Sequence, residues 1–203
     1  PPPAPKSSPP SGGSLRQPPH GLRDGLVRRG LAAMHARGIS AVAPLEVLAA
    51  LGDPFQAMAL GVLQGLLLPL DGDAPQALLA GGSQMLAVAG LFMASLTPVE
   101  RSACNDQLAV VTTAWVMQES GSDLELLAQR SAAVWGVHPR LLHSDLRFDG
   151  CRQQALLDYE RGFVKEGVGA GGLAWLCQLA GSSTQALAKS CDQACGQLLS
   201  VGP

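Results

Sequence analysis

The side chains that could bind a metal ion in this 203-residue chain are few and scattered. His138 and His143 lie near Cys151, and imidazole and thiolate are the ligands that zinc prefers. Their spacing matches no compact zinc pattern, and Pro139 makes the backbone between them irregular. Three ligands are therefore not expected to converge, and the sequence predicts no zinc site.

A calcium loop is the second metal site to consider. Asp145, Asp149 and Gly150 occupy positions that a calcium loop would use, but Arg147 takes a ligand position and Leu156 replaces the closing glutamate. The Asp71–Asp73 turn has no further carboxylates at ligand spacing either. We predict that the chain holds no metal and no cofactor.

A glycine-rich run before an apolar segment, Gly167–Gly172, invites comparison with phosphate-binding loops. Such loops present backbone N–H groups to phosphate at a helix start. Here no strand is expected before the run, and no Lys-Ser/Thr pair follows it. The sequence therefore favours a flexible connector over a nucleotide site.

Nucleophilic or acid–base catalysis finds no support among the cysteines and carboxylates. Cys104 or Cys151 would need a neighbouring histidine, and no local motif supplies one. Five cysteines are an odd set, so at least one thiol is free or paired between chains. Cys191 and Cys195, four residues apart on a predicted helix, could share a metal or form a strained disulfide, with buried reduced thiols as the alternative. We predict no catalytic residues.

Composition indicates an all-α fold. Apolar residues make up 47% of the chain and aromatic residues only 4%, so leucine and alanine must fill the core, and both favour helices. The predicted centre is a buried helix over 53–70, capped by Asp53 and begun by Pro54. It is too short for a membrane span, which needs about 20 apolar residues.

Other helices are expected around this one, as a compact bundle. The strongest local signal is Thr97, Pro98 and Glu100, which predict a capping box at the start of a helix that runs to Gln118. A second capping box begins at Ser122. The predicted helices cover 21–36, 44–51, 75–95 with an interruption at Gly81–Gly82, 97–118, 122–135, a segment after 150, 173–180 and 184–199.

Three regions follow from this pattern. Residues 1–19 hold eight prolines and are predicted to be a disordered linker. Residues 20–150 are the predicted helical bundle domain. Residues 151–203 are predicted C-terminal helices, packed on the bundle or forming a small appendage.

Two helical runs resemble a family of uncharacterised bacterial envelope proteins that share a domain of unknown function. They are LTPVERSACNDQLAVVTTAWVMQ and LLAQRSAAVWGVHPRLLHSDLRFDG. The matching positions are Leu96, Thr97, Glu100, Arg101, Gly136, Val137, Pro139 and Leu142. The resemblance covers about residues 39–150 and implies an all-helical domain exported behind a linker, hence periplasmic or secreted, but no activity. The odd cysteine count keeps a cytoplasmic location as the alternative.

Because the sequence shows no catalytic motif, we infer the function from the predicted helix surfaces. Our first hypothesis is a non-enzymatic protein–protein interaction or structural module, which could be a subunit of a larger assembly. Gly61 and Gly65 would let a partner helix approach closely. The basic helix with Arg23, Arg28 and Arg29 is the other candidate partner surface, because residues 1–40 carry a net charge of +5 against −7 in the remainder.

The alternative hypothesis is a ligand-binding or catalytic bundle with a pocket near Trp115, Trp135 and His138. A protein partner is expected and an oligomer is compatible with the sequence. Nucleic acid is not expected, because the basic helix lacks interleaved aromatic residues and the rest of the chain is acidic.

Overall fold

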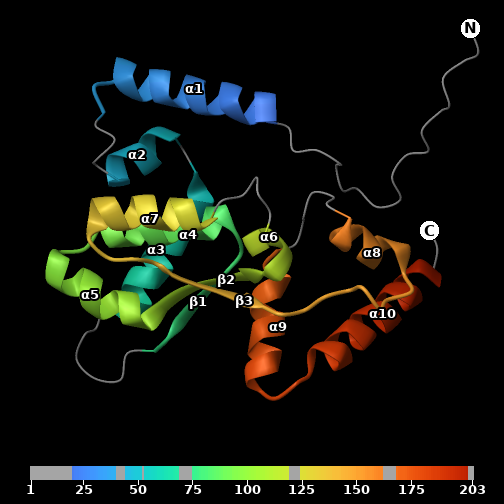
Figure 1. The fold of residues 1–203 in the computed structure, drawn as a ribbon. Helices are drawn as coiled ribbons and strands as arrows, with labels where there is room; N and C mark the ends of the chain where they lie inside the picture. Colours follow the sequence, from blue (N-terminus) through green and yellow to red (C-terminus); the bar gives the residue numbers. More distant parts are fainter. Residues whose placement is uncertain are drawn as a thin grey trace, which may run out of the picture.

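A three-stranded parallel β-sheet lies at the centre of the structure, a computed structural model (Figure 1). The structure describes residues 20–39, 44–51, 53–68, 75–118, 124–161 and 168–200. The strands β1 (Ala77–Ala80), β2 (Leu108–Thr113) and β3 (Arg140–Ser144) lie in the order β1-β2-β3. In their register, Leu79 pairs with Val110, and Val110 pairs with Leu141. The protein is therefore α/β, and the all-α prediction is wrong.

Two of the predicted helices contain the misassigned strands. The expected helix over 75–95 is β1, a turn at Gly81–Gly82, and α4 (Ser83–Ala94). The expected helix over 97–118 is α5 (Pro98–Gln107), β2 and α6 (Ala114–Gln118). All six residues of β2 are buried, and strands buried on both faces lose the alternation of apolar and polar residues that reveals a strand.

The helix α3 (Pro54–Leu67) has its predicted start but not its predicted place. The Asp53 carboxylate accepts hydrogen bonds from the N–H groups of Phe55 at 3.0 Å and Gln56 at 3.2 Å, so the predicted cap is confirmed. Only one side of α3, with Leu60, Leu63 and Leu67, is buried. The sheet, not this helix, is the centre of the core, so the prediction of a central buried helix is wrong.

Helices cover both faces of the sheet. On one face, α3, α4 and α7 (Leu124–Trp135) pack together against Leu79, Val110 and Leu141. The buried part of this core includes Leu60, Leu63, Leu67, Leu86, Val88, Phe92, Met93, Leu108 and Ala128. The helix α9 (Ala170–Leu179) lies on the opposite face, where Gly172 meets Ala80 (Figure 1).

The remaining helices lie at the two ends of this core. At one end are α1 (His20–Ala36) and α2 (Pro44–Leu51), and both match their predicted ranges within one residue. At the other end, α8 (Gln154–Glu160) and α10 (Thr184–Ser200) pack around a second, smaller cluster with Trp115, Leu146, Phe148 and Ala174. Residues 1–19, the predicted linker, lie outside the described residues.

The helix ends follow local rules. Thr97 and Glu100 form the predicted capping box at the start of α5. Gly38 and Gly136, which follow α1 and α7, have positive φ values of 66° and 77°, as expected for glycine ends of helices. Within the described segments, none of the helices has both the length and the apolar character that crossing a bilayer requires.

Candidate functional site

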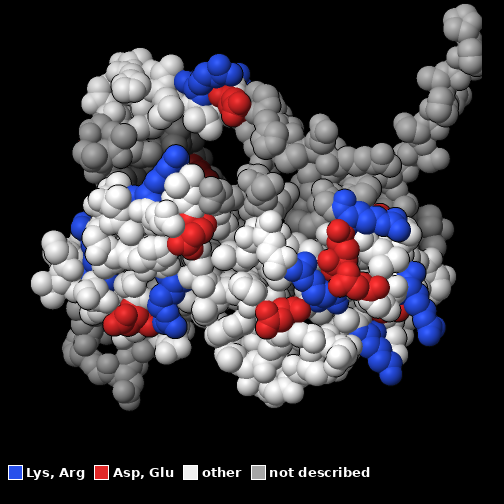
Figure 2. All heavy atoms as spheres, viewed as in Figure 1, with Lys and Arg blue, Asp and Glu red and all other residues white. Residues whose placement is uncertain are grey.

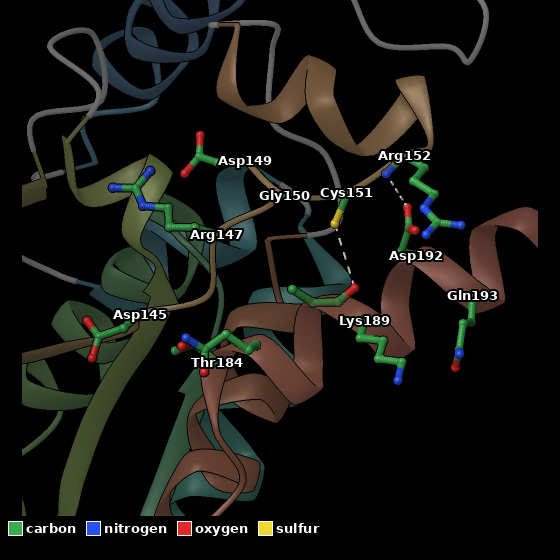
Figure 3. A pocket seen from close by; sticks show the side chains of 12 residues that line it. Asp145, Arg147, Asp149, Gly150, Cys151, Arg152, Thr184, Lys189, Asp192 and Gln193 are labelled. Carbon is green, nitrogen blue, oxygen red and sulfur yellow. Dashed lines mark hydrogen bonds between the residues drawn. The ribbon is translucent and has the colours of Figure 1, made fainter.

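A cavity of about 550 Å³ lies just beyond the carboxyl end of β3 (Figure 3). It separates the segment 145–152, which follows the strand directly, from the side of α10. In open α/β sheets, ligands bind beyond the carboxyl ends of the parallel strands. The polar side chains on its wall are those of Asp145, Arg147, Asp149, Arg152, Thr184, Gln185, Lys189, Asp192 and Gln193.

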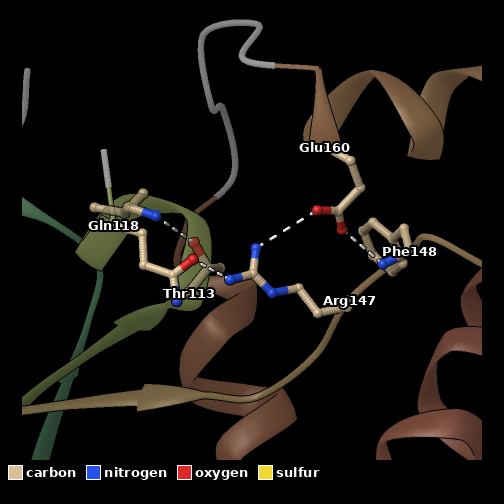
Figure 4. Close-up of polar contacts among 6 residues, drawn as sticks. Thr113, Gln118, Arg147, Phe148 and Glu160 are labelled. Carbon is tan, nitrogen blue, oxygen red and sulfur yellow. Dashed lines mark hydrogen bonds and ion pairs between the residues drawn. The ribbon is translucent and has the colours of Figure 1, made fainter. Parts of the chain in front are cut away.

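Arg147 is held in place by contacts on several sides (Figure 4). Its Nη1 lies 3.5 Å from Glu160 Oε2 on α8, and its Nη2 donates to Gln118 Oε1 on α6. The other oxygen of Glu160 accepts a hydrogen bond from the N–H of Phe148 at 2.8 Å. These contacts tie the segment after β3 to both α6 and α8.

An aromatic cluster lies beneath this segment. The ring of Trp115 is 4.9 Å from that of Phe148 and 5.3 Å from that of Tyr159, centroid to centroid. The Arg147 guanidinium lies 5.7 Å from the centre of the Trp115 ring, within the range of a cation–π contact. This aromatic cluster therefore supports the cavity wall through Arg147, and none of its three rings lines the cavity itself.

The opposite wall is fixed by Asp192 of α10. One oxygen of this carboxylate accepts hydrogen bonds from the N–H groups of Arg152 at 2.8 Å and Gln153 at 3.0 Å. The Cys151 thiol donates to the carbonyl of Ala188 at 3.7 Å. Asp192 therefore holds the loop in place and is less available to a ligand than the other carboxylates.

The thiol of the cavity is not an activated nucleophile. Burial raises the pKa of Cys151, and the negative charges of Asp192 and of Glu160 and Asp149 raise it further. Because the thiolate is the reactive form, a raised pKa keeps this group in its unreactive state near neutral pH. We therefore assign Cys151 no nucleophilic role.

Two cations on the wall are available to a bound molecule. Arg152 and Lys189 are exposed, and no described carboxylate forms an ion pair with either of them. Asp145 is also exposed, and its Oδ1 lies 3.6 Å from Nδ1 of His143. On the face seen in Figure 2, acidic and basic side chains gather together over the region of α8 and α10.

The glycine-rich segment packs tightly against the same edge of the sheet. A Cβ added at Gly169 would lie 3.2 Å from the Ala80 carbonyl oxygen, and one at Gly171 would lie 2.6 Å from the Thr113 nitrogen. These glycines let the start of α9 reach the ends of β1 and β2. The interpretation as a flexible connector missed this contact because no strands were expected. Three glycines within residues 169–172, next to an apolar run, were the available signal.

The structure does not bring together the aromatic and histidine residues of the predicted pocket. Trp115 lies beside the cavity described above. Trp135 belongs to the other core and has the Arg101 guanidinium 5.0 Å from its ring centre. His138 Nε2 is 3.2 Å from Glu125 Oε1. Among the described residues, no three histidine, cysteine or acidic side chains are grouped as metal ligands would be.

The predicted partner-binding residues lie on outer surfaces. Arg28 and Arg29 are exposed on α1, and Gly61 and Gly65 are exposed on α3. The side chain of Arg23 lies outside what the structure describes. Sequence reasoning missed Arg152, in the segment after β3, and Lys189 and Asp192, which α10 brings to the cavity by folding back on that segment.

No family model matches the chain, but several curated proteins do. This chain is 46% identical over 192 residues to a UPF0284 protein of Parasynechococcus marenigrum (strain WH8102). The matched residues make up 92% of this chain and 46% of the relative. A UPF0284 protein of Prochlorococcus marinus (strain MIT 9313) is 44% identical over 193 residues, 92% of this chain and 46% of the relative. One from Gloeobacter violaceus (strain ATCC 29082 / PCC 7421) is 43% identical over 148 residues, 73% of this chain and 37% of the relative.

These homologues form an uncharacterised family, and their names state no activity. The chain spans about half the length of the curated relatives it matches. The similarity supports the expectation of an uncharacterised family. It carries nothing on an envelope location, and the parallel sheet contradicts the all-helical domain that the resemblance implied.

Proposed function

We propose that this chain binds a small polar molecule with an anionic group in the cavity at the carboxyl end of β3. The observation that carries the proposal is the pair of available cations, Arg152 and Lys189, on the wall of a cavity of about 550 Å³. Small-molecule sites typically enclose about 300–1,000 Å³, so the size fits a single metabolite-sized ligand.

The charges around the cavity suggest which chemical groups the ligand carries. A guanidinium and an ammonium bind a phosphate or a carboxylate through charge-assisted hydrogen bonds. Asp145 and Asp149 are exposed at the same cavity and would accept hydrogen bonds from hydroxyl or ammonium groups. A ligand with an acidic end and hydrogen-bond donors elsewhere satisfies both sets.

The test uses the fluorescence of Trp115, whose ring lies 5.7 Å from the guanidinium of Arg147, a residue of the cavity wall. In a variant with Trp135→Phe and Trp175→Phe, Trp115 is the one remaining indole. The variant is titrated with inorganic phosphate, a sugar phosphate and a zwitterionic amino acid. We expect a saturable change with at least one anionic probe, and loss of about tenfold or more in affinity when Arg152→Ala and Lys189→Ala are combined.

The matched control is Arg130→Ala, which removes an exposed cation from α7, away from the cavity. It should leave the titration unchanged. Binding that persists in the double variant, or that falls equally in the control, would contradict the proposed site. So would the lack of any saturable response to all three probes.

A further inference from the structure

The outward side of α3 is apolar along its whole length. Phe55, Met58, Val62 and Leu66, spaced three or four residues apart, lie on one side of the helix, and their exposed fractions run from 45% to 72%. The helix has no charged residue in its sequence. We call these four side chains the α3 stripe. Contiguous apolar surfaces of this kind mark interaction sites.

The surroundings of the α3 stripe suit the close approach of another helix. Beside it, α2 and α3 enclose a groove of about 470 Å³, lined mainly by apolar side chains that include Leu45, Leu48 and Leu60. Gly61 and Gly65 lie on the exposed side of α3, and no described atom comes within 4 Å of where their Cβ atoms would be. Small residues in such positions let two helix backbones pack closely.

The curated relatives are about twice as long as the part of them that this chain matches. The match to the Parasynechococcus marenigrum protein uses 92% of this chain but 46% of the relative, so the other 54% of the relative has no counterpart here. In each relative, that remainder is joined to a half that resembles this chain. An apolar helix face is stable when it packs against another element, and the remainder of these longer chains supplies further polypeptide for such packing.

We propose that the α3 stripe and the adjacent groove dock an apolar helix from the part of UPF0284 chains that this sequence does not span. The occupant is an uncharged helix face with small residues opposite Gly61 and Gly65. This surface lies on α2 and α3, whereas the proposed ligand cavity is formed by the segment after β3 and by α10. The two proposals are independent and fail separately.

The test co-expresses this chain with the tagged remainder of the Parasynechococcus marenigrum relative. Size-exclusion chromatography with light scattering should show a one-to-one complex of the two polypeptides. Combining Met58→Asp with Val62→Asp should weaken this complex by about tenfold or more, because two charges would be buried without partners. Leu198→Asp places a charge on α10, where Leu198 is 78% exposed, and should leave the complex intact.

A second variant separates docking from folding. Gly65→Leu fills open space in the isolated chain, so its thermal unfolding should be unchanged or should shift upward, whereas its complex should weaken by about tenfold. A complex that tolerates both stripe variants would overturn the proposal. So would self-association of this chain that Met58→Asp disrupts, a soluble remainder that does not co-purify, or a remainder that stays aggregated despite co-expression.

Discussion

At the scale of single residues, Thr97 and Glu100 show how one local motif sets a pH response. Glu100 Oε2 accepts hydrogen bonds from the N–H and the hydroxyl of Thr97, each at 2.8 Å. The backbone bond, then the side-chain bond, holds the pKa of Glu100 below its ordinary value of 4.5. The ionised Glu100 carboxylate therefore stabilises the fold fully at pH values above its ordinary pKa of 4.5. This stabilisation is lost as the pH falls through the lower pKa that Glu100 has in the folded state.

Glu100→Gln tests this link between the capping box and pH. Urea unfolding of the two proteins should show the unmodified chain to be the more stable at about pH 6, with the difference disappearing as the pH is lowered toward about 3. Thr97→Val removes the hydroxyl partner and should reduce the pH dependence. A difference that stays constant across this range would show that the carboxylate charge plays no part.

Two glycines of this chain should respond to alanine in opposite directions. Gly171→Ala places a methyl group against the backbone of Thr112 and Thr113, which cannot move aside, so we expect a loss of about 3 kcal/mol in the free energy of unfolding. Gly65→Ala fills open space in a helix and should gain about 0.5–1 kcal/mol. Chemical denaturation followed by circular dichroism measures both, and equal effects would refute the packing described for α9.

At the scale of elements, the central strand β2 is the most buried element and the last helix, α10, is among the most exposed. Every residue of β2 is buried, and α10 has no buried residue in the part that the structure describes. Local opening exposes peripheral elements more often than the centre of a sheet. Hydrogen exchange should therefore be slowest at the amides of 108–113 and much faster along α10. Comparable protection of the two segments would contradict this arrangement.

The sequence was a good guide to elements whose signals are local. The starts of α3 and α5 were predicted because Asp53 and the Thr97–Glu100 pair cap their helices through neighbouring N–H groups. The end of α7 at Trp135 matches the predicted range, and Gly136 follows it with a positive φ. The strands were missed because their signals are not local. β1 has four residues and β2 is buried on both faces, so neither shows an alternating pattern, although the β-branched run Val110–Thr113 does favour a strand.

The site was less predictable than the elements. Asp145 and Asp149 were considered as calcium ligands and Cys151 as a zinc ligand, and Arg147 counted against the calcium loop. Their neighbours across the cavity, Lys189 and Asp192, come from α10, and Asp192 lies 40 residues after Arg152, whose N–H donates to it. Only the packing of α10 against the segment after β3 creates the cavity, and no short sequence pattern encodes that contact.

At the scale of the whole molecule, the chain presents two distinct surfaces on one α/β core, and they share no residue. One is the polar cavity beyond β3, which the fluorescence titration tests, and the other is the α3 stripe, which the co-expression experiment tests. The interaction hypothesis that began with Gly61 and Gly65 stays a prediction, now attached to a defined apolar face. The basic surface of Arg28 and Arg29 stays a prediction as well.

The regular spacing of the strands bears on how the protein is made. Ala77 pairs with Leu108, 31 residues further along, and Ala109 pairs with Arg140, again 31 residues further along. Each pairing closes a long loop, which slows the formation of a sheet relative to that of helices. α9 begins at residue 170, after all three strands, so one face of the nascent sheet stays bare until α9 has been synthesised. Exposed apolar surface of this kind makes a folding intermediate prone to aggregation.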